Sequence, residues 1–188
     1  IPTRMNFVDI AGLVRGASKG EGLGNQFLGN IRECDAVAYV LRCFENDDIT
    51  HVEGSVDPIR DLETVETELM LADLESLEKR VINLEKKAKG GDKESKLTLD
   101  LVMRAKALLE DGRPARLVKR APEEEKAFAM LQLLTALPVL YVCNVNEADA
   151  AGGNTHTAGV EQRAKQEHAA CVVICAQLEA EIAALSDE

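Results

Sequence analysis

Four short apolar runs are separated by polar stretches along the chain, and each has the length of a buried strand. They are Met5–Val8, Ala36–Cys43, Val139–Cys143 and Ala170–Ala176. Continuous apolar runs are typical of parallel strands that have helices on both faces. Segments with helical character lie next to these runs at Asn25–Cys34, Glu161–His168 and Leu178–Leu185. The alternation predicts an α/β fold with a parallel sheet.

The long interval between the second and third runs has a different pattern, in which apolar residues recur at alternating steps of four and three. They are Met70, Leu74, Leu77, Val81, Leu84 and Ala88. Such a heptad seam predicts a helix over about 61–89 that packs against another helix. Gly90-Gly91-Asp92 favours a turn. Helical spacing then resumes at Leu97, Leu101, Ala105 and Leu108, so the interval predicts an antiparallel helical hairpin.

The hairpin interrupts the α/β pattern, which predicts one domain in two parts, 1–57 and 138–188, with an insertion over 58–137. Pro122, followed by three acidic residues, opens a further helix at the end of this insertion. The resulting fold class is an incomplete doubly wound parallel sheet with an inserted antiparallel helical hairpin.

Charge is unevenly distributed along the chain. The formal net charge of −11 argues against a general nucleic-acid binder, because phosphate contacts require a basic surface. Residues 44–78 carry 12 acids and one base, whereas residues 79–120 carry 13 bases and six acids. The basic stretch is either the solvated surface of a helix or a docking site for an anionic partner.

The five cysteines lie in apolar runs, are odd in number and form no C-x-x-C pair. This pattern favours core packing and a reducing cytoplasm over a disulfide or metal role. The apolar runs are too short to cross a bilayer, so we expect a soluble chain with no membrane role.

The tetrapeptide D-x-x-G follows the first apolar run. In phosphate-loop hydrolases, an Asp at the end of a strand holds Mg²⁺ through water, and a Gly three residues later donates its N–H to the terminal phosphate. Asp9 and Gly12 have this spacing, although a simple turn after a strand would have it too. Leu13 stands where many such enzymes have a water-orienting Gln. His51 is the candidate substitute, because His can orient or deprotonate water, with a surface loop residue as the alternative.

The sequence N-x-x-E follows the third apolar run as Asn144, Val145, Asn146 and Glu147. Guanine-specific enzymes have N-K-x-D there, and the Asp accepts hydrogen bonds from two N–H groups of guanine. The longer Glu and the missing Lys predict a weaker guanine preference that makes adenine admissible. The Ser-Ala-Lys motif of guanine enzymes is replaced by Cys175, Ala176 and Gln177. The loop G-x-x-x-x-G-K-[ST] is absent from the 188 residues.

Together these motifs closely resemble the Obg-like ATPase (YchF) family of phosphate-loop NTPases. The most specific segments are FVDIAGLVRGASKGEGLGNQFLGNIRECDAVAYVLRCFENDDITHVEG, KKAKGGDKES and YVCNVNE. The resemblance implies a cytoplasmic, ribosome-associated regulatory hydrolase of ATP, with GTP as the alternative nucleotide and Mg²⁺ as its cofactor. It implies Asp9 at the magnesium, Gly12 at the terminal phosphate and His51 in place of the missing Gln. It further places Asn144, Val145 and Glu147 at the base.

The family pattern extends beyond both ends of this sequence, with the phosphate loop ahead of Ile1 and a small C-terminal domain after Glu188. We therefore expect a chain that is truncated at both ends and inactive by itself. An absent central strand would leave sheet edges unpaired and favour self-association. The alternative function is a non-catalytic helical-hairpin module that binds RNA or the ribosome through its basic tip.

Overall fold

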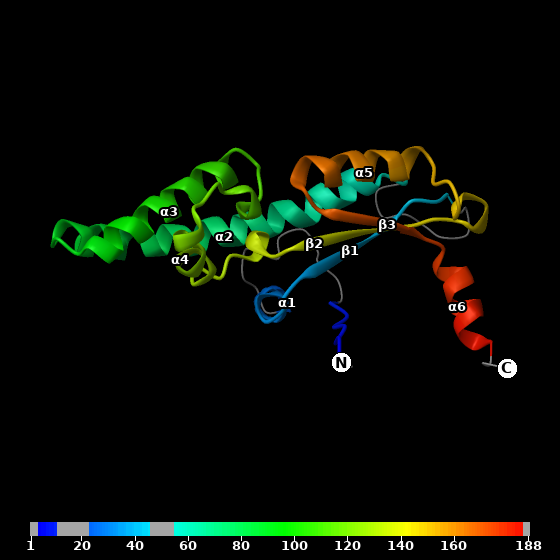
Figure 1. The fold of residues 1–188 in the computed structure, drawn as a ribbon, viewed down its shortest axis with the longest axis horizontal. Helices are drawn as coiled ribbons and strands as arrows, with labels where there is room; N and C mark the ends of the chain where they lie inside the picture. The colour runs from blue at the N-terminus through cyan, green and yellow to red at the C-terminus, as the bar shows by residue number, and fades with distance from the viewer. Residues whose placement is uncertain (1–3, 11–22, 46–54, 186–188) are drawn as a thin grey trace. The chain divides into compact units, whose positions relative to one another are not determined.

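The structure is a computed structural model that describes residues 4–10, 23–45 and 55–185. The chain divides into two compact units, one of Ile1–Cys34 with Val65–Ala136 and the other of Asp35–Thr64 with Leu137–Glu188. In chain order, the helices and strands of Figure 1 are α1 (Leu23–Arg32), β1 (Val37–Arg42), α2 (Pro58–Lys89), α3 (Lys93–Glu110), η2 (Ala115–Leu117), η3 (Pro122–Glu124), α4 (Glu125–Ala129), η4 (Leu134–Ala136), β2 (Val139–Asn144), η5 (Glu147–Asp149), α5 (Thr155–Glu167), β3 (Ala170–Ile174) and α6 (Ala176–Ala184).

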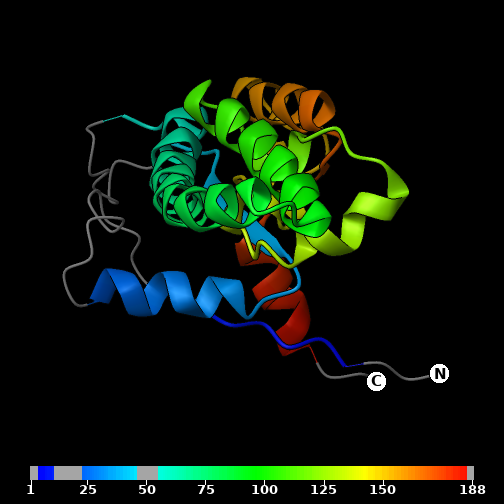
Figure 2. The same ribbon diagram turned by 90° about the vertical axis from the view of Figure 1, so that its left-hand side faces the viewer.

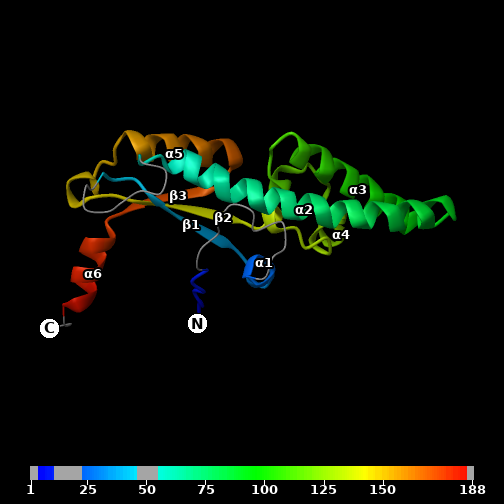
Figure 3. The ribbon, with the colours of Figure 1, turned by 180° about the vertical axis from the view of Figure 1, so that it is seen from behind.

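In the part of the chain that the structure describes, the second unit is built on a parallel sheet of three strands in the order β1-β2-β3. These strands coincide, within a few residues, with three of the four predicted apolar runs. Helix α5 covers one face of the sheet over β2 and β3, as the views from the front and from behind both show (Figures 1 and 3). Tyr39 and Tyr141 are buried on neighbouring strands, and their rings stack with centroids 5.8 Å apart. The predicted α/β class with a parallel sheet is thus confirmed.

The prediction of a strand at Met5–Val8 is wrong for this structure, because the segment is irregular. Its apolar side chains are exposed, and Phe7 has 84% of its surface accessible. A strand is stable only when its backbone N–H and C=O groups pair with a neighbouring strand. Within the described residues, no strand lies beside this segment. An apolar run of four residues therefore did not suffice to identify a strand.

The first unit contains the predicted hairpin, in which α2 and α3 run antiparallel and meet at Gly90 and Gly91. Figure 2 shows the two helices side by side, seen from the end at which they are joined. Gly91 has a φ of +92°, a conformation that residues with a Cβ rarely adopt, so a glycine is required at this turn. Asp92 then caps α3 by accepting a hydrogen bond from the backbone N–H of Glu94.

The seam of the hairpin follows the predicted heptad. Leu77 of α2 and Leu101 and Ala105 of α3 belong to one buried apolar cluster with Phe128 of α4. Seam residues that are partly buried pack against this cluster: Met70, Leu74, Val81, Leu84 and Leu108. Leu97 was predicted to continue the same row, but its side chain is 69% exposed. Helical spacing identified α3 correctly and placed its first seam residue wrongly.

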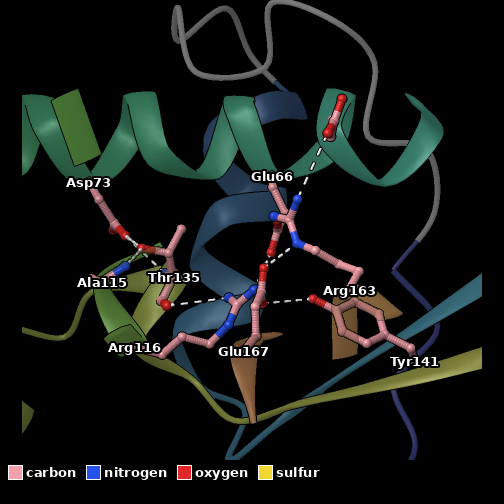
Figure 4. Close-up of polar contacts among 9 residues, drawn as sticks. Glu66, Asp73, Ala115, Arg116, Thr135, Tyr141, Arg163 and Glu167 are labelled. Atoms are coloured by element: carbon pink, nitrogen blue, oxygen red, sulfur yellow. Dashed lines mark hydrogen bonds and ion pairs between the residues drawn. The ribbon is translucent and has the colours of Figure 1, made fainter. Parts of the chain in front are cut away.

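A buried carboxylate ties α2 to the segments that follow the hairpin (Figure 4). Asp73 is only 1% exposed and accepts hydrogen bonds from Leu134 N at 2.8 Å and from Thr135 N at 2.9 Å. The hydroxyl of Thr135 donates to Asp73 at 2.7 Å and accepts from the backbone N–H of Ala115 at 3.0 Å. This chain of contacts joins α2, η4 and η2.

A second polar contact fastens the same region of the first unit. Glu66 of α2, which is buried, forms an ion pair with Arg116 of η2. Removing one member of a buried ion pair leaves the other charge without that compensation, so such pairs strongly favour one arrangement of the chain.

Within the described residues, no helix has both the length and the apolar surface that a membrane crossing would need.

Candidate functional site

The candidate site lies in the second unit, at the carboxyl ends of the parallel strands. In open α/β sheets, ligands bind where the loops leave these ends. Asn144 is the last residue of β2, and its Oδ1 accepts a hydrogen bond from the backbone N–H of Ala176 at 3.0 Å. Ala176 is the first residue of α6, which follows β3. Two loops that were predicted to surround a base are thereby brought together.

Asn154 joins a third loop to the same edge of the sheet. Its Nδ2 donates to the carbonyl oxygen of Cys43, just after β1, at 2.8 Å and to Asp149 at 2.9 Å. Its Oδ1 caps α5 by accepting from the N–H groups of His156 and Thr157. One side chain thus fixes the loop after β1 and the start of α5.

Asn154 was not identified from the sequence, although the chain carries a signal for it. Asn154 and Thr157 form a capping box, in which each side chain accepts a hydrogen bond from the backbone N–H of the other. The pair lies just after Gly152-Gly153, a dipeptide that marks a turn, and Asn is a preferred residue at the start of a helix. The predicted start of this helix, Glu161, was therefore six residues late.

The predicted base-binding residues differ in exposure. Glu147 is exposed and begins η5, whereas Val145 is only 2% exposed and its N–H donates to the carbonyl of Ile174 at 2.9 Å. Cys175 is buried, and its carbonyl begins the hydrogen bonding of α6 by accepting from Glu179 N at 3.0 Å. Gln177 is exposed and donates to Glu181 at 3.2 Å. Polar groups that can reach a ligand thus come from Asn144, Glu147 and Gln177.

The predicted phosphate and magnesium residues are described only in part. Asp9 is exposed and directly follows Met5–Val8 in the irregular segment 4–10, which belongs to the first unit. Gly12 and His51 lie outside the described residues, so their predicted roles stay predictions. Across residues 4–10, 23–45 and 55–185, no three or more His, Cys, Asp or Glu side chains cluster in a way that could hold a metal ion.

Three thiols lie on the face of the sheet that α5 covers. The Sγ atoms of Cys143 and Cys171 are 3.8 Å apart, and all five cysteines are free thiols. A hydrogen bond with Cys143 lowers the pKa of Cys43 and raises the pKa of Cys143 itself, which burial raises further. Burial raises the pKa of Cys171 to about 12. Cys143 and Cys171 therefore stay protonated near neutral pH, which fits the predicted packing role and not a reactive thiolate.

A buried network beneath the site attaches α5 to β2 (Figure 4). The hydroxyl of Tyr141 donates to Glu167 at 2.9 Å, and Arg163 forms an ion pair with the same carboxylate. Arg163 also lies 3.8 Å from a carboxylate oxygen of Glu63, in the first turns of α2. Because these contacts fix α5 on the sheet, they also position Asn154 at its amino end.

Comparison with known proteins identifies the family. The model of the 50S ribosome-binding GTPase family matches residues 2–144. The chain is 51% identical over 188 residues to the ribosome-binding ATPase YchF of Haemophilus influenzae, covering 100% of this chain and 52% of that protein. It is 47% identical over 190 residues to the ribosome-binding ATPase YchF of Bacillus subtilis, again covering 100% of this chain and 52% of the relative. The chain belongs to the YchF family.

A solved structure of a YchF protein supports the same assignment. The Schizosaccharomyces pombe YchF GTPase superposes with a TM-score of 0.77 at 32% identity, covering 95% of this chain and 50% of that chain. The resemblance read from the motifs is thus confirmed, as is the fold class of a phosphate-loop NTPase sheet with a helical insertion. The chain spans about half the length of the curated YchF relatives it matches. Family membership does not assign individual residues to a nucleotide, so those roles stay predictions.

Proposed function

We propose that the intact protein binds and hydrolyses ATP, with GTP as the alternative nucleotide, and acts as a regulator on the ribosome in the cytoplasm. The observation that carries this proposal is the hydrogen bond from Ala176 N to Asn144 Oδ1, which joins the loops after β2 and β3. Relatives that are 51% and 47% identical in sequence are named ribosome-binding ATPases. These names support ATP as the nucleotide and the ribosome as the partner.

Recognition of the base rests on groups at the carboxyl ends of β2 and β3. Because Asn144 Oδ1 already accepts from Ala176 N, its amide Nδ2 is the group that can donate to a purine acceptor. The exposed carboxylate of Glu147 can accept from an N–H of the base. Val145 is buried and cannot cover the ring with a long stem, as the Lys of guanine enzymes does. Compared with an N-K-x-D motif, which selects guanine, this combination shifts the preference towards adenine.

In this proposal, residues of the amino-terminal segment bind Mg²⁺ and the terminal phosphate. The exposed Asp9 carboxylate is compatible with Mg²⁺, which keeps several waters and takes one or two protein carboxylates beside the phosphates. When bound, the ion neutralises charge on the phosphate oxygens. In this proposal Gly12 donates its N–H to the terminal phosphate, and His51 orients the attacking water.

The isolated 188 residues are expected to hydrolyse no nucleotide, because they contain no G-x-x-x-x-G-K-[ST] loop. Without that loop, the chain lacks the backbone N–H groups and the Lys that hold the phosphates. Release of phosphate from ATP with magnesium is the measurement. Turnover above background that disappears in Asp9→Ala would contradict this expectation.

Glu147→Ala in the protein expressed from its complete gene should weaken binding of the fluorescent nucleotide mant-ATP about tenfold or more. A hydrogen bond to a charged acceptor contributes roughly 1.5–3 kcal/mol, and 1.4 kcal/mol corresponds to a factor of ten. Fluorescence titration gives the dissociation constant of each variant.

Glu179→Ala is the matched control, since Glu179 is an exposed glutamate on α6. It should leave the mant-ATP affinity unchanged. Glu147→Asp tests the preference for the base, because the shorter carboxylate should raise the affinity for mant-GTP relative to mant-ATP. Unchanged affinities in both Glu147 variants would argue that this carboxylate does not contact the base.

A second candidate function is docking of the hairpin on RNA or the ribosome. Around the turn at Gly90 and Gly91, the lysine side chains are all exposed: Lys86, Lys87, Lys89, Lys93 and Lys96. Flexible ammonium groups suit contact with phosphates, and such binding weakens steeply as salt rises. The two functions are compatible in one protein, with the nucleotide governing access of the hairpin to its partner.

Replacing Lys86, Lys87 and Lys89 by alanine should weaken ribosome binding and reduce its dependence on salt. The slope of log affinity against log salt should become shallower by roughly two to three units if all three lysines contact phosphates. Cosedimentation with ribosomes at several salt concentrations provides the slope. The matched control replaces Lys119, Lys126 and Lys165, which are also exposed, by alanine. An equal change in both triple variants would indicate an effect of net charge and not of the hairpin tip.

A further inference from the structure

A pocket in the first unit is lined by two helices, and none of its described lining residues belongs to the proposed nucleotide site. It has a volume of about 360 Å³ and lies between α1 and α2. Helix α1 contributes Leu28 and Arg32, which are one turn apart, and α2 contributes Ala72, Lys79 and Arg80. Residues four positions apart lie on the same face of a helix, so each helix presents one row of side chains to the pocket.

The lining is strongly cationic within a protein that is acidic overall. Among the described lining residues, Arg32, Lys79 and Arg80 supply three positive charges and Glu75 supplies the one carboxylate. That carboxylate is already engaged, because Glu75 Oε1 lies 2.6 Å from Lys79 Nζ. No other acid among the lining residues that the structure describes balances the two guanidinium groups.

Neither guanidinium group uses all of its hydrogen-bond donors in contacts with the described residues. Within the described part of the chain, Arg32 is exposed and forms no hydrogen bond or ion pair. Arg80 donates to the carbonyl oxygen of Met130 at 3.4 Å, near the outer limit for a hydrogen bond. Both groups therefore retain donors for a ligand.

The buried carboxylate of Asp73, near this pocket, is not available to the two arginines. Asp73 senses the positive charge of Arg32, but its oxygens accept three hydrogen bonds from Leu134 and Thr135. Burial raises the pKa of Asp73, and the charge of Arg32 is the smallest of the influences that oppose this. Asp73 therefore has a structural role and leaves the donors of Arg32 available for a ligand.

We propose that this pocket binds a phosphate group, with Arg32 and Arg80 as its principal ligands. The planar guanidinium fork matches the oxygens of a phosphate and forms short, charge-assisted hydrogen bonds with them. Leu28 and Ala72 provide an apolar wall that suits the organic part of a phosphate ester. The volume lies within the range of ordinary small-ligand pockets.

A ligand held by both helices stabilises the unit, because it binds the folded state and not the unfolded one. The two sources of the group are free inorganic phosphate and a small phosphate ester. Inorganic phosphate and phenyl phosphate are the probes that distinguish them, and benzoate is the carboxylate counterpart. Titration calorimetry at constant ionic strength measures each affinity in the protein expressed from its complete gene.

The expected result is saturable binding of phenyl phosphate that is tighter than binding of benzoate. Arg32→Ala should weaken the binding of phenyl phosphate about tenfold or more. Arg113→Ala is the matched control, since Arg113 is an exposed arginine of the same unit. It should leave the affinity unchanged. Arg80→Gln provides a second variant, and circular dichroism of every variant verifies its folding.

Stronger binding of phenyl phosphate than of inorganic phosphate would identify an ester as the ligand, and equal binding would identify the phosphate group alone. The proposal is overturned if binding is not saturable at millimolar phenyl phosphate. Equal affinity in Arg32→Ala, Arg80→Gln and the unaltered protein would overturn it as well, because the phosphate would then bind elsewhere. Phenyl phosphate has no purine, so failure here leaves the proposed binding of ATP untouched.

Discussion

Asp73→Ala is expected to lower the free energy of unfolding by about 3 to 5 kcal/mol, because it removes the acceptor of three buried hydrogen bonds. Each buried donor left without a partner costs roughly 1–3 kcal/mol. The loss of the buried charge offsets part of this cost, since an ionised carboxylate is expensive to bury. Urea denaturation followed by circular dichroism measures the change.

Asp100→Ala is the matched control, because Asp100 is an exposed aspartate on α3 that contacts Arg104 at 2.9 Å. An exposed ion pair of this kind contributes at most about 1 kcal/mol. If both variants lost the same free energy of unfolding, the three buried hydrogen bonds of Asp73 would contribute no more than an exposed ion pair.

The same carboxylate predicts a dependence on pH. Burial raises the pKa of Asp73 above its usual value of 3.8, so the folded state binds this proton more tightly than the unfolded state. A raised carboxyl pKa makes its contribution to stability fall as pH rises between the unfolded and folded values. Lowering the pH from neutral towards 4 should therefore favour the Asp73 protein over Asp73→Asn, which cannot titrate. A difference between the two proteins that is constant with pH would contradict the shift.

The sheet and the hairpin could be predicted because their signals are local in the sequence. Continuous apolar runs identified β1, β2 and β3, and the heptad spacing of α2 identified the hairpin. Met5–Val8 and Leu97 were placed wrongly for the same physical reason. Periodicity reports which side chains suit burial, whereas burial also requires a partner surface that only the fold supplies.

The polar contacts that fasten the first unit could not be predicted. Asp73 and Thr135 are 62 positions apart, and Glu66 and Arg116 are 50 apart. An acidic residue in a helix usually lies in solvent, so a single sequence gives no reason to bury Asp73. The partners are defined only when η2 and η4 return to α2.

The candidate site was predicted in part. Asn144 and Ala176 were named as members of one base-binding site, and the structure brings them within hydrogen-bonding distance. The motifs predicted this proximity because each loop directly follows a strand, and parallel strands end at one edge of a sheet. Asn154 was overlooked because a capping residue acts through the backbone and carries no motif of nucleotide chemistry.

Leu101→Ala is expected to lower the free energy of unfolding by about 2 to 5 kcal/mol. Leu101 is only 1% exposed and lies in the apolar cluster that joins Leu77 of α2 to Phe128 of α4. Truncation removes the transfer energy of its side chain and leaves a cavity among close-packed neighbours. The shift of the urea midpoint at an unchanged slope gives the size of the effect.

Leu97→Ala provides a control that differs only in burial, because it is the same substitution one turn earlier on the same helix. Its side chain is 69% exposed, so its truncation should change stability by no more than about 0.5 kcal/mol. Alanine also favours helix slightly more than leucine does, which works against any loss. Comparable losses in the two variants would mean that Leu97 is buried in solution. The buried row of α3 would then extend to Leu97, as the helical spacing of Leu97, Leu101, Ala105 and Leu108 had predicted.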